Sequence, residues 1–218
     1  MVRRTKEEAQ ATRKLILDTA EVVFHERGVS RSTLHDIALA AGLTRGAIYW
    51  HFKDKADLFN AMMERVTLPL EETAHGSDDE SLDDPIAYMR ANFLQALRLT
   101  ANDPQVRRVF GIAIHKVEYV DELRAVRDRH LRIRDECLLH AQRGVTLAQR
   151  RGLLPKRIPA RAAAIGLHAM IDGLLQNWLL DPEAFDLVKT GQQVLDAYLA
   201  GLGVAASAAS KLDRPKGT

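Results

Sequence analysis

The fold of this chain is decided by residues 33–59, TLHDIALAAGLTRGAIYWHFKDKADLF, in which a glycine separates two short helical patterns. Thr33, followed three residues later by Asp36, has the form of a capping box and predicts a helix that begins directly after it. Gly42 can adopt the left-handed backbone that ends this helix, and a second short helix then runs to about Trp50. Two short helices joined in this way are typical of a helix-turn-helix.

The spacing of apolar residues in this stretch also fits a helix-turn-helix. The motif needs a small residue where its helices cross, a glycine in the turn four residues later, and a branched apolar residue six positions beyond the glycine. Ala38, Gly42 and Ile48 fill these positions, and Ile37, Leu43 and Phe52 are expected to pack with them. Such a set also arises by chance, so the spacing alone does not establish a DNA-binding motif. The residues that the second helix exposes provide the further evidence.

The second helix carries more hydrogen-bond donors and aromatic edges than so short a segment can bury. Arg45 can bond to base edges or phosphate, and Gly46 allows the backbone to approach a groove. Lys55 and Thr33, each beside the start of a helix, suit phosphate contacts. The candidate DNA-contacting residues are Thr33, Thr44, Arg45, Gly46, Tyr49, Trp50, His51 and Lys55. The alternative is that the aromatic side chains among them pack between helices.

The rest of the sequence is helical in pattern and globular in composition. Apolar residues make up 46% and charged residues 28% of the 218 residues, which excludes disordered and fibrous classes. Apolar residues recur at i, i+3 and i+4, and alternation at period two is absent, so the expected fold is all-α. The expected helices are Glu7–Arg27, Leu34–Ala41, Leu43–Trp50, Lys55–Leu70, Ile86–Thr100, Pro104–Val117, Asp121–Gly152, Ala160–Leu180 and Pro182–Leu202.

Charge is unevenly distributed along the chain and indicates where domains meet. Residues 71–84 carry seven acidic and no basic side chains, and residues 71–85 have no apolar periodicity, which is typical of a linker or exposed loop. The expected organisation is a head over residues 1–55, a larger helical body over 56–203 and a flexible tail over 204–218.

Cysteine content and hydropathy indicate the compartment. Cys137 is the only cysteine, so no disulfide forms within the chain, and the opening MVRRTKEEAQ lacks the apolar core of a signal peptide. The longest apolar runs fall short of the ~20 residues that span a bilayer. We therefore expect a cytoplasmic protein with no membrane span.

Several stretches of this sequence carry a family resemblance: residues 33–59, the opening MVRRTKEEAQ, and the later HKVEY and DGLLQNW. On these residues the chain resembles the TetR family of transcriptional repressors, and within it the AcrR- and TtgR-like regulators of efflux pumps. The resemblance extends over roughly residues 5–200. It implies a homodimer with a three-helix DNA-binding head and a helical ligand-binding and dimerisation body, with DNA contacts at the eight positions named above. It implies no catalytic residue and no cofactor.

The last two expected helices supply a candidate dimer interface. The helix over Ala160–Leu180 has almost no polar face, so it needs cover from its own core and from a second surface. One short helix reads only a few base pairs, whereas two copies spaced ~34 Å apart can recognise a specific site. The interface candidates are Ile165, Leu167, Met170, Ile171, Leu174, Leu175, Trp178, Leu179, Val188, Val194, Leu195, Tyr198 and Leu202. The alternative is a monomer whose own helices enclose these side chains.

Polar residues within the same apolar helix mark a candidate ligand site. His168, Asp172 and Gln176 are spaced four apart and form one stripe, which either pairs with itself or with neighbouring helices, or faces a pocket. The family resemblance favours a pocket for hydrophobic, drug-like compounds. Candidates for its wall are Met89, Phe93, Phe110, Ile114 and Cys137. Ordinary core packing is an equally good interpretation of each wall residue.

These features predict a ligand-responsive homodimeric repressor that binds a palindromic operator, is released by hydrophobic compounds and controls a multidrug efflux operon. One alternative is a constitutive DNA-binding regulator without induction. Another is an all-α enzyme in which His168 and Asp172 act as acid and base, although the sequence offers no nucleophile or phosphate loop. No metal is expected, because His115 and Glu118 lack the further ligands that a site requires.

Overall fold

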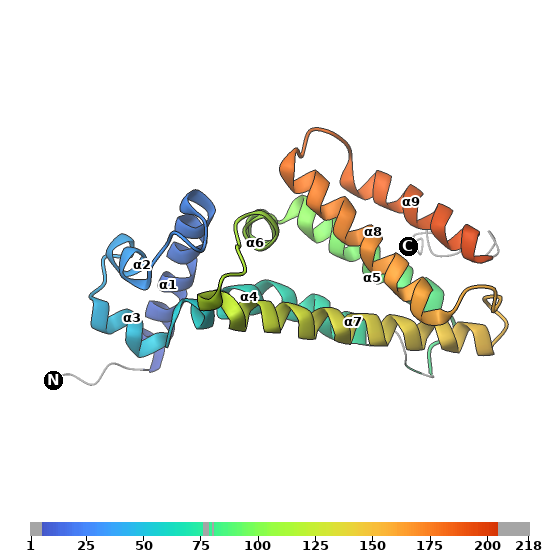
Figure 1. Cartoon of the computed structure of the whole chain (residues 1–218), viewed down its shortest axis with the longest axis horizontal. Helices are drawn as coiled ribbons and strands as arrows, with labels where there is room; N and C mark the ends of the chain where they lie inside the picture. The colour runs from blue at the N-terminus through green and yellow to red at the C-terminus, as the bar shows by residue number, and fades with distance from the viewer. Residues whose placement is uncertain (1–5, 76–78, 80, 205–218) are drawn as a thin grey trace, which may run out of the picture. The chain divides into compact units, whose positions relative to one another are not determined.

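The structure, a computed structural model, describes residues 6–75, 79 and 81–204, and the regular structure in these ranges is helical throughout (Figure 1). The helices are α1 (Lys6–Arg27), α2 (Leu34–Ala40), α3 (Arg45–His51), α4 (Lys55–His75), α5 (Pro85–Asn102), α6 (Pro104–His115), the 3-10 turn η2 (Asp121–Leu123), α7 (Arg124–Arg150), α8 (Ala160–Leu180) and α9 (Leu187–Leu202). The all-α prediction is confirmed. The predicted tail lies outside the described residues from 205 on. None of the helices described is long and apolar enough to cross a bilayer.

Two helix boundaries, the end of α4 and the start of α9, differ from the expectation by five residues, and the others differ by at most three. α4 continues to His75, so residues 71–75 of the predicted linker are helical. Glutamate and alanine have good helix propensity, and extending an existing helix avoids the cost of nucleating a new one. α9 begins at Leu187 rather than at Pro182, because the Asp186 carboxylate accepts a hydrogen bond from the Lys189 amide at 2.9 Å and caps the helix there.

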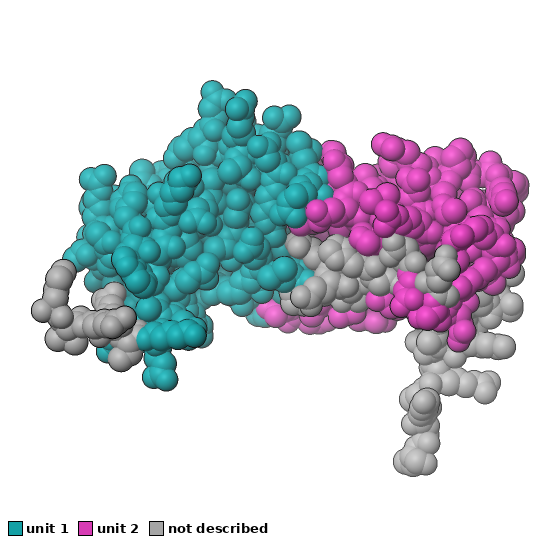
Figure 2. All heavy atoms as spheres, turned by 90° about the horizontal axis from the view of Figure 1, so that it is seen from below, with its two compact units in different colours: residues 1–68, 104–132 teal, residues 69–103, 133–218 magenta. Residues whose placement is uncertain are grey.

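The chain folds into two compact units, coloured teal and magenta in Figure 2. Unit 1 consists of residues 1–68 and 104–132, and unit 2 of residues 69–103 and 133–218. The chain therefore passes between the units within α4, between α5 and α6, and within α7. The domain boundaries expected after residues 55 and 203 stay a prediction.

The core of unit 1 joins α1, α2 and α3 to α4 and α6. Phe24, Ile48 and Leu58 are fully buried, and Phe24 packs against Phe59 with their ring centroids 6.2 Å apart. Burial of each such side chain contributes roughly 1.5–3 kcal/mol to folding. The apolar stripe of α1 is thus the surface on which the short helices assemble.

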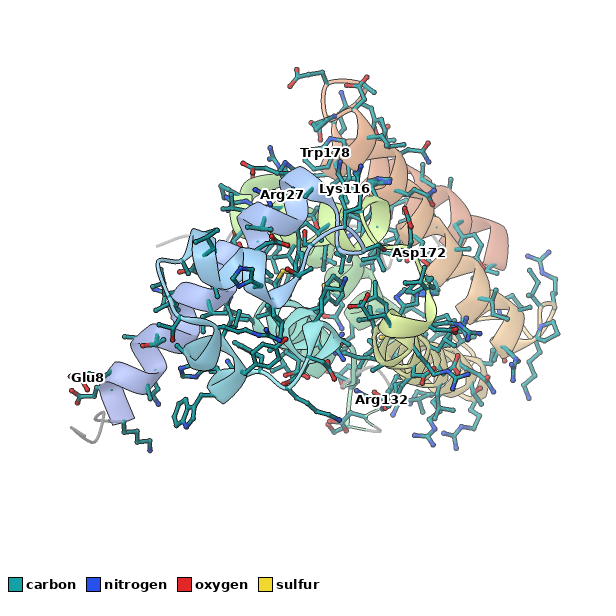
Figure 3. The ribbon with its side chains drawn as sticks, turned by 60° about the vertical axis from the view of Figure 1, so that its left-hand side comes forward. Glu8, Arg27, Lys116, Arg132, Asp172 and Trp178 are labelled. Carbon is teal, nitrogen blue, oxygen red and sulfur yellow. The ribbon has the colours of Figure 1, made fainter. Side chains whose placement is uncertain are left out.

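The loop after α1 is held by the end of α6. Gly28 ends α1 as predicted, and the next amide, of Val29, donates to the Lys116 carbonyl at 2.9 Å. The Ser32 hydroxyl donates to the Gly28 carbonyl at 2.7 Å. In Figure 3, Lys116 lies beside the end of α1 that Arg27 marks. These bonds fix the point from which α2 starts.

Unit 2 contains the close packing of α9 on α5 and α8 (Figure 1). A Cβ added to Gly191 of α9 would lie 2.1 Å from Cδ1 of Leu97 in α5. A Cβ on Gly166 of α8 would lie 2.2 Å from the hydroxyl of Tyr198 in α9, and that hydroxyl donates to the Ala163 carbonyl at 3.0 Å. A side chain at either position would force Leu97 or Tyr198 to move, so glycine favours these two close crossings although it weakens a helix interior.

Candidate nucleic-acid interface

α2 begins at the capping box that the sequence predicts. The Asp36 amide donates to Thr33 Oγ1 at 3.1 Å, and the Thr33 amide donates to Asp36 Oδ2 at 2.9 Å. The Thr33 hydroxyl donates to the same carboxylate oxygen at 2.6 Å. The hydroxyl and then the amide of Thr33 lower the pKa of Asp36, because both hydrogen bonds favour the charged carboxylate.

The turn between α2 and α3 depends on Gly42. Its φ of 67° lies in the left-handed region, which other residues rarely adopt. The Leu43 amide donates to the Ala38 carbonyl at 2.8 Å and closes the turn. Thr44 then caps α3, since its Oγ1 accepts from the Ala47 amide at 3.2 Å. The predicted helix-turn-helix is confirmed.

One face of α3 is buried. Ile48 and the following Phe52 are at most 1% exposed, as are Ile37 and Ala38 of α2. α2 and α3 are in contact, so these four side chains form the small core that the spacing predicts, while Leu43, also expected there, is half-buried. With its apolar face used in this way, α3 directs its other side chains outward.

The outward face of α3 carries most of the predicted DNA-contacting residues. The exposed members are Thr44, Arg45, Gly46, Tyr49 and Trp50, with Trp50 71% exposed and Tyr49 47%. Tyr49 therefore does not pack between helices. Neighbouring large aromatic side chains left in water mark a binding surface. α3 also bears no carboxylate, so it can approach a polyanion without like-charge repulsion.

Contacts within α3 order this surface. The Arg45 guanidinium carbon lies 5.5 Å from the ring centroid of Tyr49, one helical turn further on. The half-buried ring of His51 meets Trp50 edge-on, with centroids 4.6 Å apart. Side chains ordered before binding lose less conformational entropy when a partner arrives.

Lys55, a predicted phosphate contact, lies inside unit 1 with 5% of its side chain exposed. Its ammonium donates to the carbonyls of Ser30 and Ser32 at 3.1 and 3.0 Å and pairs with Glu122 at 3.2 Å. A buried ammonium needs such partners because water no longer solvates it. In this arrangement the Lys55 side chain joins the loop before α2 to the start of α4, and its contact with a DNA phosphate stays a prediction.

One exposed cation beside α3 was not singled out by sequence reasoning. The guanidinium carbon of Arg13 in α1 lies 5.1 Å from the ring centroid of Phe52, at the end of α3. The signal was available, because Arg13 precedes Leu17 by one turn on the face of α1 that also carries buried Ala20 and Phe24. A cation at the end of that stripe lies next to whatever the stripe packs against.

The ligand-site candidates divide between the units. His168 Nε2 lies 3.3 Å from Asp172 Oδ2, so two members of the polar stripe pair with each other. Asp172, labelled on α8 in Figure 3, and Gln176 are exposed. Of the wall candidates, Phe93 is buried, Met89, Phe110 and Cys137 are half-buried, and Ile114 is exposed. Phe110 and Ile114 belong to unit 1 and the other six candidates to unit 2. The ligand site stays a prediction.

The described part of the chain brings together no group of three or more His, Cys, Asp or Glu side chains able to hold a metal ion. What it does bring together is a capped helix-turn-helix with an outward face of arginine, tyrosine and tryptophan. That arrangement defines a DNA-binding protein of the helix-turn-helix class.

Comparison with known proteins narrows this class. The family of bacterial regulatory proteins named tetR matches residues 16–62, and the C-terminal region of MAATS-type transcriptional repressors matches residues 84–204. The chain is 41% identical over 203 residues to the HTH-type transcriptional regulator TtgR of Pseudomonas putida, covering 91% of this chain and 95% of TtgR.

Two solved structures are similar over their whole length. NalD, the secondary repressor of the MexAB-OprM multidrug efflux pump in Pseudomonas aeruginosa, is 35% identical with a TM-score of 0.82, covering 90% of this chain and 98% of NalD. SmeT, the repressor of the Stenotrophomonas maltophilia multidrug efflux pump SmeDEF, is 32% identical in its triclosan complex, with a TM-score of 0.83 and coverage of 96% and 100%.

The chain belongs to the TetR family of transcriptional regulators, and efflux-pump repressors are among its relatives. The family resemblance drawn from residues 33–59 is thereby confirmed. The relatives are regulators rather than enzymes, in agreement with the expectation that the chain has no catalytic activity.

Proposed function

We propose that this protein is a homodimeric repressor that binds a palindromic operator, is released by hydrophobic drug-like compounds and controls a multidrug efflux operon. The observation that carries the proposal is the outward face of α3, where Trp50 and Tyr49 are exposed beside Arg45 on a helix without carboxylates. Efflux-pump repressors among the relatives support the regulated process.

In this proposal α3 enters the major groove of the operator. Arg45 bonds to a guanine edge or a phosphate, and its stacking on Tyr49 aims the guanidinium. Thr44, exposed at the start of α3, binds a phosphate and sets the register of the protein on the duplex, whereas both donors of Thr33 are already used by the Asp36 carboxylate. Trp50 and His51 complete the contact surface, and Gly46 allows the backbone to come close.

The dimer rests on a geometric requirement and on a surface of unit 2. A seven-residue helix reads few base pairs, so specific binding needs a second copy one turn of duplex away, ~34 Å. Part of the predicted interface is used within unit 2, where Leu175, Trp178 and Leu195 are buried. Ile165 of α8 and Val194 of α9 are 47% and 40% exposed and remain available to a partner copy.

The inducer class follows from the relatives and from the composition of the predicted wall. SmeT has been solved with triclosan, a small apolar compound, and Met89 and Phe93 of unit 2 are suited to such a ligand. A ligand releases DNA only if it prefers the conformation that binds DNA poorly, and coupling of this kind is typically about 5–150-fold in affinity. α4, which follows α3 and continues into unit 2, is the proposed lever.

The experiment is fluorescence anisotropy with labelled duplexes from the region upstream of the gene, at fixed salt, with and without triclosan. Wild type is expected to bind one duplex specifically, and Arg45→Glu to lose that binding while keeping its helical circular dichroism. Asp172→Ala is expected to bind DNA normally and to change the response to the compound. If compounds that bind the protein, as shown by calorimetry, leave operator affinity unchanged, induced release is excluded and the constitutive alternative is favoured.

A further inference from the structure

Glu21, in the second half of α1, is a buried carboxylate that belongs to neither the candidate DNA-contacting residues nor the candidate ligand site. It is 2% exposed and is the one acidic side chain that the described residues bury. An ionised carboxylate in such a place is stable only when cations and hydrogen-bond donors surround it. The donors to Glu21 therefore show which helices this carboxylate connects.

The donors to Glu21 come from two other helices. Arg65 of α4 pairs with Oε1, and the Gln105 amide of α6 donates to the same oxygen at 2.8 Å. Arg108, one turn further along α6, lies 3.7 Å from Oε2. All four residues belong to unit 1. One side chain of α1 is thus bonded to α4 and to α6 at once.

α4 and α6 are also segments in which the chain enters or leaves unit 1. α4 continues past residue 68 into unit 2, and α6 begins at Pro104, directly after the unit 2 helix α5. α1 in turn packs against α2, and α2 packs against α3. A movement of either connecting helix therefore reaches α1 through the bonds to Glu21.

We propose that Glu21 is a positioning residue that clamps α1 to α4 and α6 and so sets the orientation of the DNA-binding helices. The inference rests on the proposed function, because it assigns to Glu21 the control of operator binding. It differs from a purely structural role in one respect: a protein without the clamp stays folded but binds its operator weakly, because the helices that present α3 are no longer fixed.

Asp18 provides a matched control. It lies one turn before Glu21 on α1 and pairs with the same Arg65 at 2.7 Å, but its side chain is 48% exposed. Glu21→Gln and Asp18→Asn make the same chemical change, carboxylate to amide, on one helix and toward one partner. Exposed pairs contribute little, so the two variants separate the buried clamp from the loss of a charge.

The experiment compares full-length variants by operator anisotropy, hydrogen exchange and circular dichroism. Glu21→Gln is expected to weaken operator binding about tenfold or more, within the range of typical couplings. Amide exchange is expected to accelerate in residues 104–115 and around Arg65, while residues 160–202 exchange as in wild type. Asp18→Asn is expected to stay within twofold of wild type in affinity, with unchanged exchange.

Gln105→Ala tests the contact between α1 and α6 separately, since it removes the side-chain amide that donates to Glu21 and leaves Arg65 of α4 in place. It is expected to weaken operator binding and to accelerate exchange in residues 104–115. Combined with Glu21→Ala, which removes both carboxylate oxygens, it should add nothing, because the hydrogen bond from Gln105 is then already lost, whereas additive losses would contradict the clamp. Should Glu21→Gln fail to fold, Gln105→Ala decides alone.

The clamp is overturned if Glu21→Gln, or Gln105→Ala in its place, binds the operator within twofold of wild type with unchanged exchange in α6. Failure of the proposed function looks different, because wild type itself then binds none of the upstream duplexes. In that case the exchange of residues 104–115 still supports or refutes the contact that Glu21 makes.

Discussion

Replacing Lys55 with methionine tests whether this side chain serves the protein interior or the DNA backbone. Methionine keeps the length and apolar stem of lysine but removes the ammonium, which donates to two carbonyls and pairs with Glu122. Hydrogen bonds from a charged donor contribute about 1.5–3 kcal/mol each, and the relief of desolvation offsets part of this. Glu122 is 62% exposed, so its pair adds at most about 1 kcal/mol.

The expected loss for Lys55→Met is therefore about 2–4 kcal/mol in the free energy of unfolding. Urea unfolding followed by circular dichroism, at one protein concentration, measures it. Lys53→Met is the control, because Lys53 is an exposed lysine two residues away, and its change should stay within about 0.5 kcal/mol.

The salt dependence of operator binding separates the two roles of Lys55. Each phosphate contact contributes about 0.9 to the slope of log affinity against log salt. If Lys55 is an internal anchor, the slope for Lys55→Met equals that of wild type. A variant as stable as wild type, with a slope smaller by about 0.9, would refute the anchor and restore the phosphate contact.

Three further outcomes are expected in unit 1. Ile48→Ala, at a fully buried position, should lose about 2–5 kcal/mol in urea unfolding, and Ile48→Val only about 0.5–1.5. Gly42→Ala should cost about 1–2 kcal/mol from backbone strain alone, because nothing lies within 4 Å of the added Cβ, and Gly42→Asn should unfold closer to wild type. The Thr33 hydrogen bonds lower the pKa of Asp36 below 3.8. Wild type should therefore be more stable than Asp36→Asn by the full amount above pH 3.8, and this advantage should vanish as the pH falls through the lowered pKa. Thermal midpoints of the two proteins, measured across pH, would show it.

The helix-turn-helix was predictable because its determinants are local. A capping pair three residues apart, a glycine that must take a positive φ, and an isoleucine at a fixed spacing all lie within 33–59, so no distant contact was needed to recognise them. The start of α9 was missed because Pro182 is acceptable at a helix start, whereas Asp186 is the residue that caps it.

The positions of Lys55 and Glu21 could not be read from the sequence. Glu21 meets Arg65 and Gln105 across 44 and 84 residues, and Lys55 meets Ser30 across 25, so burial of both charges depends on how distant helices pack. In sequence, a lysine at the start of a helix beside a DNA-binding motif looks like a phosphate contact, whether its side chain is exposed or buried in the folded protein. Propensity and spacing do not distinguish the two outcomes.

The discontinuous make-up of unit 1 matters for anyone building chimeric regulators. A graft that transplants residues 1–68 alone would import Glu21 and Val29 without Gln105, Arg108 and Lys116, their partners in 104–132. The α6 of the recipient protein would then face the buried Glu21 carboxylate without the side chains that neutralise it. Exchanging both segments together keeps every one of these bonds, so hybrid sensors with new operator preference should be assembled from the two pieces as a set.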